Sequence, residues 1–244
     1  MTEAEWLKCT NPTPMVEFLW GKASERKLRL FAVACCHRIS HLLHDKRSRE
    51  AVEVGEQHAD GLVTDESLED ARENSSDASG EAHRVAAASG WSANTWIANA
   101  AANAAYGVCG HWQNWLSDSR LFETPIWAAR ATAGPEVEHL LSDAAQQQGF
   151  ENEQAVQCQL LRDIFGPMLF KGVEFDQTIL MWNNGTVVKM AHSIYDDRAF
   201  DRLPILTDAL QEAGCTDAEI LTHCRGAGPH VRGCWVVDLI LGKK

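Results

Sequence analysis

The sequence predicts an all-α protein that folds as a multi-helical bundle. Apolar residues recur at steps of three and four, as Leu28, Phe31 and Cys35 do, which is typical of amphipathic helices. Alanine is dense in the middle of the chain and favours helix. The 244 residues are 45% hydrophobic, enough for a substantial core without disulfides. The segment near 168–185 is the least helical part: LFKGVEF could be a short extended piece, and Asn183-Asn184-Gly185 is a turn signal.

The N-terminal helical part covers residues 1–62. Thr2 and Glu5 form a capping-box pattern at the start of a short helix over 2–8. Ser24 is placed to cap the clearest helix of the chain, which we expect over 25–44, and a further helix follows over 47–59. The apolar stripe of the 25–44 helix predicts a central place in this part of the bundle.

The middle part, residues 63–149, is acidic and rich in alanine and tryptophan. Thr64 is placed to cap a stretch over 65–88 with few large apolar residues, which predicts either a loosely packed helix or partial disorder. Trp112 and Trp115 lie in the alanine-rich stretch that follows, and they are candidates for a partner-binding surface. The usual burial of tryptophan favours the alternative, that they anchor the core.

The C-terminal part covers residues 150–244, and we expect all three parts to form one compact unit. The apolar spacing predicts a helix over 135–147, at the end of the middle part, and further helices over 151–165, 186–198, 203–213 and 217–224 in the C-terminal part. The segment from Cys234 to Leu241 is apolar nearly all round, which indicates a buried last helix or, as the alternative, a buried strand.

Four residues of the last thirty have a spacing that suits zinc. Cys215, Cys224, His230 and Cys234 give C-x8-C-x5-H-x3-C, and three thiolates with one imidazole can close a tetrahedral zinc site. The intervals equal those of the C-x8-C-x5-C-x3-H zinc finger with the last two ligand types exchanged. The alternative, favoured by how free cysteines usually behave, is that these thiols are buried apolar residues.

The stretch 223–238 also holds ingredients of an anion site or a small enzyme. Arg225 and Arg232 lie among loop glycines that could let a backbone approach a phosphate or carboxylate. The alternative is a tight turn between helices. His230, Cys234 and Asp238 would share a helix face as a weak thiol–imidazole–carboxylate candidate. No established catalytic motif is present in the sequence, so an enzyme is the less favoured interpretation.

Three histidines of the expected 25–44 helix give a weaker metal candidate. His37, His41 and His44 would lie along one side of that helix, although no H-E-x-x-H motif accompanies them. We therefore expect a solvated face there.

The net charge and the cysteines of the sequence indicate which class of partner and which cellular compartment to expect. The net charge of −12 disfavours nucleic acid, since phosphate neutralisation supplies most of that affinity. No apolar run approaches the length of a membrane span, and the acidic N-terminus does not resemble a signal peptide. The eight cysteines show no framework of a small secreted domain, so we expect reduced thiols in a cytoplasmic protein.

Three segments carry a resemblance to a known set of proteins. They are RKLRLFAVACCHRI near the N-terminus, LLRDIFG at 160–166, and RLPILTDALQEAGC with ILTHCRGAGPHVRGCWVVDLILGK at the C-terminus. They resemble an uncharacterised family abundant in planctomycete genomes. The resemblance covers most of the chain outside roughly 63–150, and it implies no fold, substrate or cofactor.

The function predicted from these patterns is a non-catalytic protein-interaction or accessory module whose partner is another protein. The first alternative is a protein stabilised by zinc through the C-x8-C-x5-H-x3-C cluster. The second is a small enzyme or anion binder that uses the 223–238 stretch.

Overall fold

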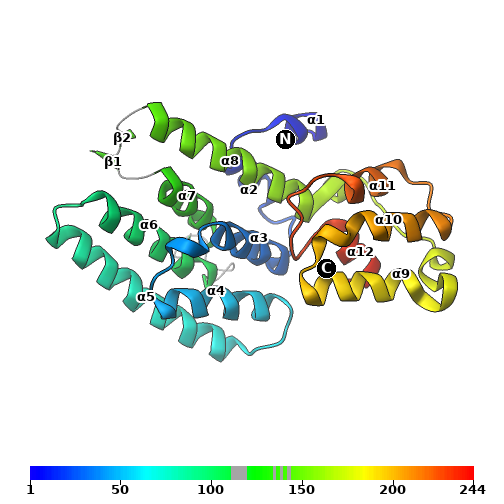
Figure 1. Cartoon of the computed structure of the whole chain (residues 1–244), viewed down its shortest axis with the longest axis horizontal. Helices are drawn as coiled ribbons and strands as arrows, with labels where there is room; N and C mark the ends of the chain where they lie inside the picture. The colour runs from blue at the N-terminus through cyan, green and yellow to red at the C-terminus, as the bar shows by residue number, and fades with distance from the viewer. Residues whose placement is uncertain (111–119, 134–135, 138–139, 142–143) are drawn as a thin grey trace. The chain divides into compact units, whose positions relative to one another are not determined.

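The computed structural model describes residues 1–110, 120–133, 136–137, 140–141 and 144–244. Within these residues the chain is helical apart from one pair of two-residue strands, which confirms the all-α prediction. The chain divides into two compact units, which we name the central unit (Lys8–Cys158) and the terminal unit (Met1–Leu7 with Gln159–Lys244). Both chain ends therefore belong to the terminal unit (Figure 1). The division at residues 62 and 149 stays a prediction.

The central unit is a bundle around α3 and α6. Its elements are α2 (Pro12–Leu19), α3 (Glu25–Arg38), the 3-10 helix η1 (Ser40–Leu42), α4 (Lys46–Ala59), α5 (Asp65–Ala88), α6 (Ala93–Val108), α7 (Arg120–Ala133), the strands β1 (Glu136–Val137) and β2 (Leu140–Leu141), and the start of α8 (Ala144–Phe165). The predicted caps are present: Ser24 accepts a hydrogen bond from the Lys27 amide, and Thr64 accepts one from the Ser67 amide. The 65–88 stretch is one continuous helix.

Small residues bring the helices of the central unit close together. Buried alanines of α6 face its neighbours, and α6 packs against α4, α5 and α7. At one crossing, a Cβ added to Gly55 of α4 would lie 2.4 Å from Cγ1 of Val108 on α6. Glycine is therefore required at this contact between the two helices.

Three expected boundaries differ from the structure. The helix expected over 25–44 ends at Arg38, and a 3-10 turn follows it, so His37, His41 and His44 do not share one helix face. The helix expected over 135–147 is replaced by the β1–β2 pair, with Glu136 opposite Leu141, and α8 begins only at Ala144. α8 continues through Gly149 without a break. The sequence predicted an interruption there, between the helices expected over 135–147 and 151–165.

The terminal unit assembles around the last helix. Its elements are α1 (Glu3–Lys8), the end of α8, the 3-10 helix η3 (Gly166–Leu169), α9 (Gln177–Asp197), the 3-10 helix η4 (Phe200–Arg202), α10 (Leu203–Glu212), α11 (Ala218–Arg225) and α12 (Trp235–Leu241). The described segment 168–185 contains no strand: an irregular stretch leads into α9, which is kinked at residues 182–185.

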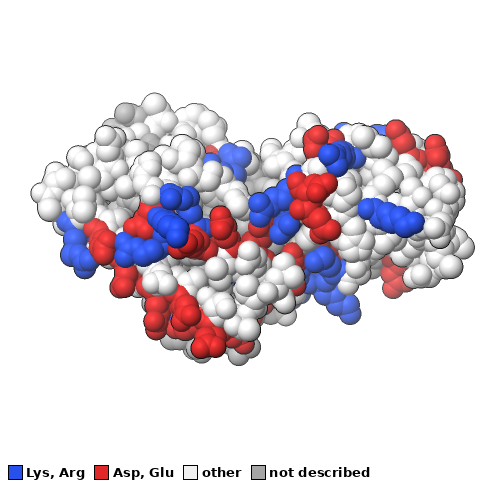
Figure 2. All heavy atoms as spheres, turned by 60° about the horizontal axis from the view of Figure 1, so that its bottom comes forward, with Lys and Arg blue, Asp and Glu red and all other residues white. Residues whose placement is uncertain are grey.

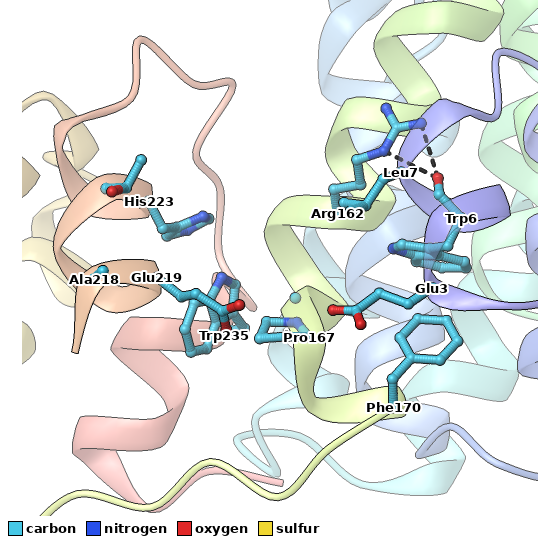
Figure 3. Close-up of a pocket in the computed structure, with 12 residues that line it drawn as sticks. Glu3, Trp6, Leu7, Arg162, Pro167, Phe170, Ala218, Glu219, His223 and Trp235 are labelled. Atoms are coloured by element: carbon cyan, nitrogen blue, oxygen red, sulfur yellow. Dashed lines mark hydrogen bonds between the residues drawn. The ribbon is translucent and has the colours of Figure 1, made fainter.

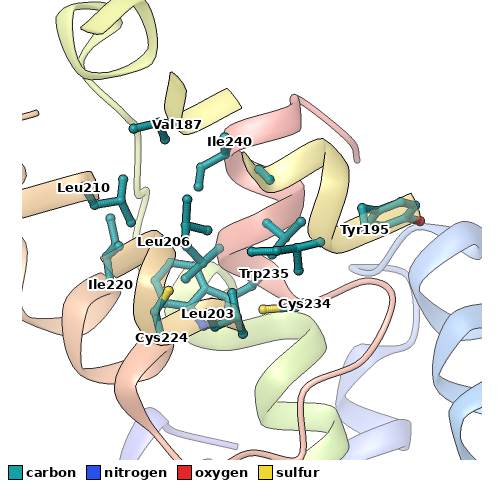
Figure 4. Close-up of a cluster of buried hydrophobic side chains, with 14 of the residues drawn as sticks. Val187, Tyr195, Leu203, Leu206, Leu210, Ile220, Cys224, Cys234, Trp235 and Ile240 are labelled. Atoms are coloured by element: carbon teal, nitrogen blue, oxygen red, sulfur yellow. The ribbon is translucent and has the colours of Figure 1, made fainter. Parts of the chain in front are cut away.

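The core of the terminal unit lies between α9, α10, α11 and α12 (Figure 4). Leu203, Leu206 and Leu210 project from one face of α10 toward Trp235 and Ile240 of α12. The apolar segment from Cys234 to Leu241 is thus a buried helix and not a strand, which confirms the first of the two predictions for it. Among the described residues, no helix combines the length and the apolar character that crossing a bilayer requires.

Candidate metal centre

Four side chains of the terminal unit converge on one point. Asp163 comes from α8, His223 from α11, His230 from the loop after α11, and Cys234 from the residue that precedes α12. One ligand atom from each lies within 4.8 Å of the other three. Within the part of the chain that the structure describes, no second group of this kind occurs.

Local chain geometry explains how His223 reaches this point. Asp217 caps α11 by accepting hydrogen bonds from the amides of Glu219 and Ile220. Ile220 and Cys224 point into the core of the unit and are buried. Because neighbouring residues on a helix point in different directions, His223 is directed away from that core and toward Asp163.

The loop between α11 and α12 brings His230 back against the end of α8. Gly228 has a φ of +82°, and a Cβ there would lie 2.8 Å from the backbone nitrogen of His230. Only glycine fits this position without strain. The loop then ends at Cys234, the N-cap residue of α12, and both residues of this segment lie near Asp163.

Asp163 is the centre of the group. Its Oδ1 atom lies 2.6 Å from Nδ1 of His230 and 3.1 Å from Nε2 of His223. Its Oδ2 atom accepts a hydrogen bond of 2.9 Å from the backbone amide of Val231, which fixes the orientation of the carboxylate. The Asp163 side chain is only 3% exposed, so it is a buried acid whose charge needs compensation.

The two histidines are also held in place by further contacts. His230 Nε2 lies 3.3 Å from the carbonyl oxygen of Gly226, to which it donates, so its Nδ1 atom is directed at Asp163. His223 Nε2 lies 3.2 Å from the Cys234 sulfur, and the two imidazole rings pack edge to face with centroids 4.8 Å apart. A single nitrogen of His223 therefore faces both the carboxylate and the thiol.

Burial and mutual contact shift the ionisation of the group. Burial would raise the pKa of Asp163, but its hydrogen bonds with both histidines outweigh this and hold the pKa below the usual range. Burial would lower the pKa of His230, yet the contact with Asp163 raises it overall. Burial raises the pKa of the Cys234 thiol well above its ordinary value, and the Asp163 charge adds to the effect. The thiolate therefore needs a nearby cation.

The structure brings together two of the four residues in the predicted zinc motif. His230 and Cys234 belong to the group, whereas Cys215 and Cys224 lie in the hydrophobic core of the unit (Figure 4). Burial raises the pKa of Cys215, and it raises the pKa of Cys224 to about 12. Asp163 and His223, not Cys215 and Cys224, complete the group around His230 and Cys234.

The other predicted site residues lie elsewhere. Asp238 is buried in α12 and is not among the converging groups; the carboxylate at His230 is Asp163. The guanidinium of Arg225 contacts Gln211 and Asp208 of α10, whereas that of Arg232 stacks 5.1 Å from the Tyr195 ring of α9. Trp112 and Trp115 lie outside the described residues, so the proposed partner surface stays a prediction.

Sequence reasoning did not find Asp163, although a signal was present. Asp163 follows Leu160 by three residues and precedes Ile164, so an acid stands on the apolar face of a predicted helix. A buried acid requires a partner, and this alone would have pointed to a site. His223 directly precedes Cys224 and lies outside the finger-like spacing.

Comparison of the chain with protein-family models, with curated proteins and with solved structures gave no match. The resemblance carried by the three sequence segments stays a prediction.

Proposed function

We propose that the protein binds a zinc ion through Asp163, His223, His230 and Cys234, and that the ion holds the terminal unit together. The observation that carries the proposal is the convergence of these four ligand atoms, from α8, α11 and the segment between α11 and α12, to within 4.8 Å of one another. Tetrahedral zinc has bonds of about 2.0–2.3 Å, which separates its ligand atoms by roughly 3.2–3.8 Å. Side-chain adjustments of less than about 1 Å would reach that geometry.

The orientation of the nitrogen atoms favours a shared cation. Nε2 of His223 and Nδ1 of His230 both face Oδ1 of Asp163, and the Cys234 sulfur faces the same His223 nitrogen. Lone pairs directed at one point repel unless a proton or a metal ion lies among them. A catalytic thiol triad would instead use the two different nitrogens of one imidazole for the thiol and for the acid.

The ligand types and their charges indicate zinc among the metals. Imidazole and thiolate suit zinc, whereas calcium and magnesium prefer oxygen ligands. One carboxylate and one thiolate would neutralise the two charges of Zn²⁺, which matters for a group whose Asp163 and Cys234 are buried.

Four protein ligands make a closed site, which is typical of structural zinc. We therefore extend the proposal to a non-catalytic role: the ion stabilises a unit that serves an interaction with another protein. The eight cysteines are all free thiols, which supports a reducing, cytoplasmic setting. On the face drawn in Figure 2, basic and acidic side chains stand intermingled, and this supports a protein partner more than a nucleic acid.

The test is the metal content of protein purified without chelators, measured by elemental mass spectrometry on the wild type and on paired variants. We expect about one zinc per chain in the wild type and in Cys215→Ser. We expect strong loss in Cys234→Ser and in His223→Ala, since each removes one of the four ligands. Zinc that survives Cys234→Ser but not Cys215→Ser would restore the C-x8-C-x5-H-x3-C set. A wild type that takes up no zinc, even when refolded with it, would end the proposal.

A further inference from the structure

A cavity of about 420 Å³ opens in the terminal unit beside the metal centre (Figure 3). α1, α8 with η3, α11 and α12 each contribute to its wall, which is mainly apolar; Trp6, Leu7, Pro167, Phe170 and Trp235 line it. This volume lies within the range of small-molecule sites. The cavity is thus large enough for a ligand with a compact apolar body.

Two carboxylates face one another across this cavity. Glu3 reaches in from α1, and Glu219 reaches in from the first turn of α11 (Figure 3). Both are partly exposed, with side-chain exposures of 43% and 48%. The remaining charged side chain of the wall, Arg162, donates from two nitrogens to the Trp6 carbonyl oxygen at 3.2 and 3.0 Å, and so is directed at the backbone of α1.

An ammonium group of this chain, that of Lys171, already contacts both carboxylates, although Lys171 is not among the residues that line the cavity. Nζ of Lys171 hydrogen-bonds to Glu219 and lies 3.7 Å from Oε1 of Glu3. Lys171 is 44% exposed, and such exposed ion pairs are weak. The contact demonstrates that the two acids can share one ammonium, and a ligand can displace a side chain held so weakly.

From these features we propose that the cavity binds a small organic cation, a primary amine carried on an apolar or aromatic body. The ammonium takes the place of Lys171 between Glu3 and Glu219, and the body lies against Pro167 and Phe170. Aromatic rings add to the attraction for a cation, because their faces are negative. The inference goes beyond the zinc proposal: His223 lines the cavity and is a proposed zinc ligand, but the residues proposed to contact the amine are Glu3, Glu219, Pro167 and Phe170.

The test uses phenethylamine as probe, titrated into the full-length, zinc-treated protein and followed by calorimetry and by ligand-detected magnetic resonance. Its neutral analogue 2-phenylethanol and its anionic analogue 3-phenylpropionate have the same ring and chain length. We expect saturable binding of the amine below about 10 mM, as suits a ligand of this size, and at least fivefold weaker binding of both analogues. Equal binding of the three compounds, or no saturation by the amine, would overturn the proposal.

Three variants then locate the binding. Glu3→Gln combined with Glu219→Gln should weaken amine binding about fivefold or more, because both ion pairs are lost. Lys171→Met should tighten it several-fold, because the internal competitor is removed. Glu212→Gln, at an exposed acid of α10 in the same unit, is the matched control and should leave binding unchanged. An unchanged affinity in the double variant would refute the proposed contacts.

The zinc content of each sample is measured alongside the titration. A zinc-free protein that binds the amine refutes the zinc proposal alone, and a zinc-loaded protein that does not bind it refutes the amine proposal alone.

Discussion

The indole ring of Trp235 lies directly against the backbone of Gly166. A Cβ atom added to Gly166 would come within 2.4 Å of Cγ of Trp235. Gly166 also has a φ of +51°, a backbone conformation that residues other than glycine rarely adopt. Gly166 follows Asp163 by three residues, and Trp235 directly follows Cys234. The contact therefore sets the distance between the elements that carry two of the proposed ligands.

Gly166→Ala is expected to destabilise the terminal unit. The added methyl group must displace a buried indole, and overpacking of this kind costs about 1–3 kcal/mol, to which the left-handed backbone adds about 1 kcal/mol. Urea unfolding monitored by circular dichroism measures the change. Gly172→Ala is the control, because a Cβ at Gly172 meets nothing within 4 Å. If the two variants unfold at the same urea concentration, the close contact with Trp235 is refuted.

Metal removal should lower the stability of the terminal unit. A ligand that binds only the folded state stabilises it, by about 2.7 kcal/mol when its free concentration is a hundred times its dissociation constant. We therefore expect a chelator to lower the midpoint of thermal unfolding of the wild type. His192→Ala, a change at an exposed histidine of α9, should keep this sensitivity, whereas His223→Ala should lose it. If a chelator lowered the unfolding midpoint of His223→Ala as much as that of the wild type, the effect would not come from metal bound at the proposed site.

The helices were predictable where one periodic pattern covers a long segment. The start of α3 was predicted from the cap Ser24 and the apolar stripe of Leu28, Phe31 and Cys35. The start of α5 was predicted from the cap Thr64. The apolar spacing over 135–147 predicts a helix, but short apolar runs also fit strands, and the structure has two antiparallel strands at Glu136–Val137 and Leu140–Leu141. Local spacing does not decide between the two when a segment is this short.

The site was half predictable for a related reason. His230 and Cys234 lie four residues apart, and their spacing was visible in the sequence. Asp163 comes from a helix that precedes them by more than sixty residues, so no local spacing could have joined it to them. The finger-like intervals pointed to Cys224, whereas α11 directs the Cys224 thiol into the core and the His223 imidazole to the site.

Thiol reactivity should separate one cysteine from the other seven. Cys9 is partly exposed, whereas Cys35, Cys36, Cys109, Cys158, Cys215, Cys224 and Cys234 are buried. Burial raises the pKa of Cys109 and of Cys224 to about 12, so little thiolate forms at neutral pH. We expect a thiol reagent to label the native protein at a single site, and Cys9→Ser to abolish that fast phase.

Labelling of all eight cysteines should follow only after unfolding in denaturant. Fast labelling of Cys215 or Cys224 in the folded protein would contradict their place in the core of the terminal unit.

At the crossing of α4 and α6, a Gly→Ala change is expected to lower stability, although helix propensity alone would raise it. Alanine is a better helix former than glycine by about 1 kcal/mol, so Gly→Ala inside a helix ordinarily stabilises a protein. At Gly55 the new methyl group would meet Val108 at 2.4 Å. We therefore expect Gly55→Ala to destabilise the central unit by about 1–3 kcal/mol in denaturant unfolding, since the two helices must separate.

Two further variants distinguish this contact from a general effect of alanine. Gly80→Ala in α5 is the control, because its Cβ would approach only the flexible end of Arg84, at 4.0 Å, and it should stabilise the unit by about 0.5–1 kcal/mol. Val108→Ala combined with Gly55→Ala should recover much of the loss, because truncating Val108 removes the atom that the new methyl group meets. If the double variant were as unstable as the sum of the two single ones, the close approach of α4 and α6 at Gly55 would not be the cause.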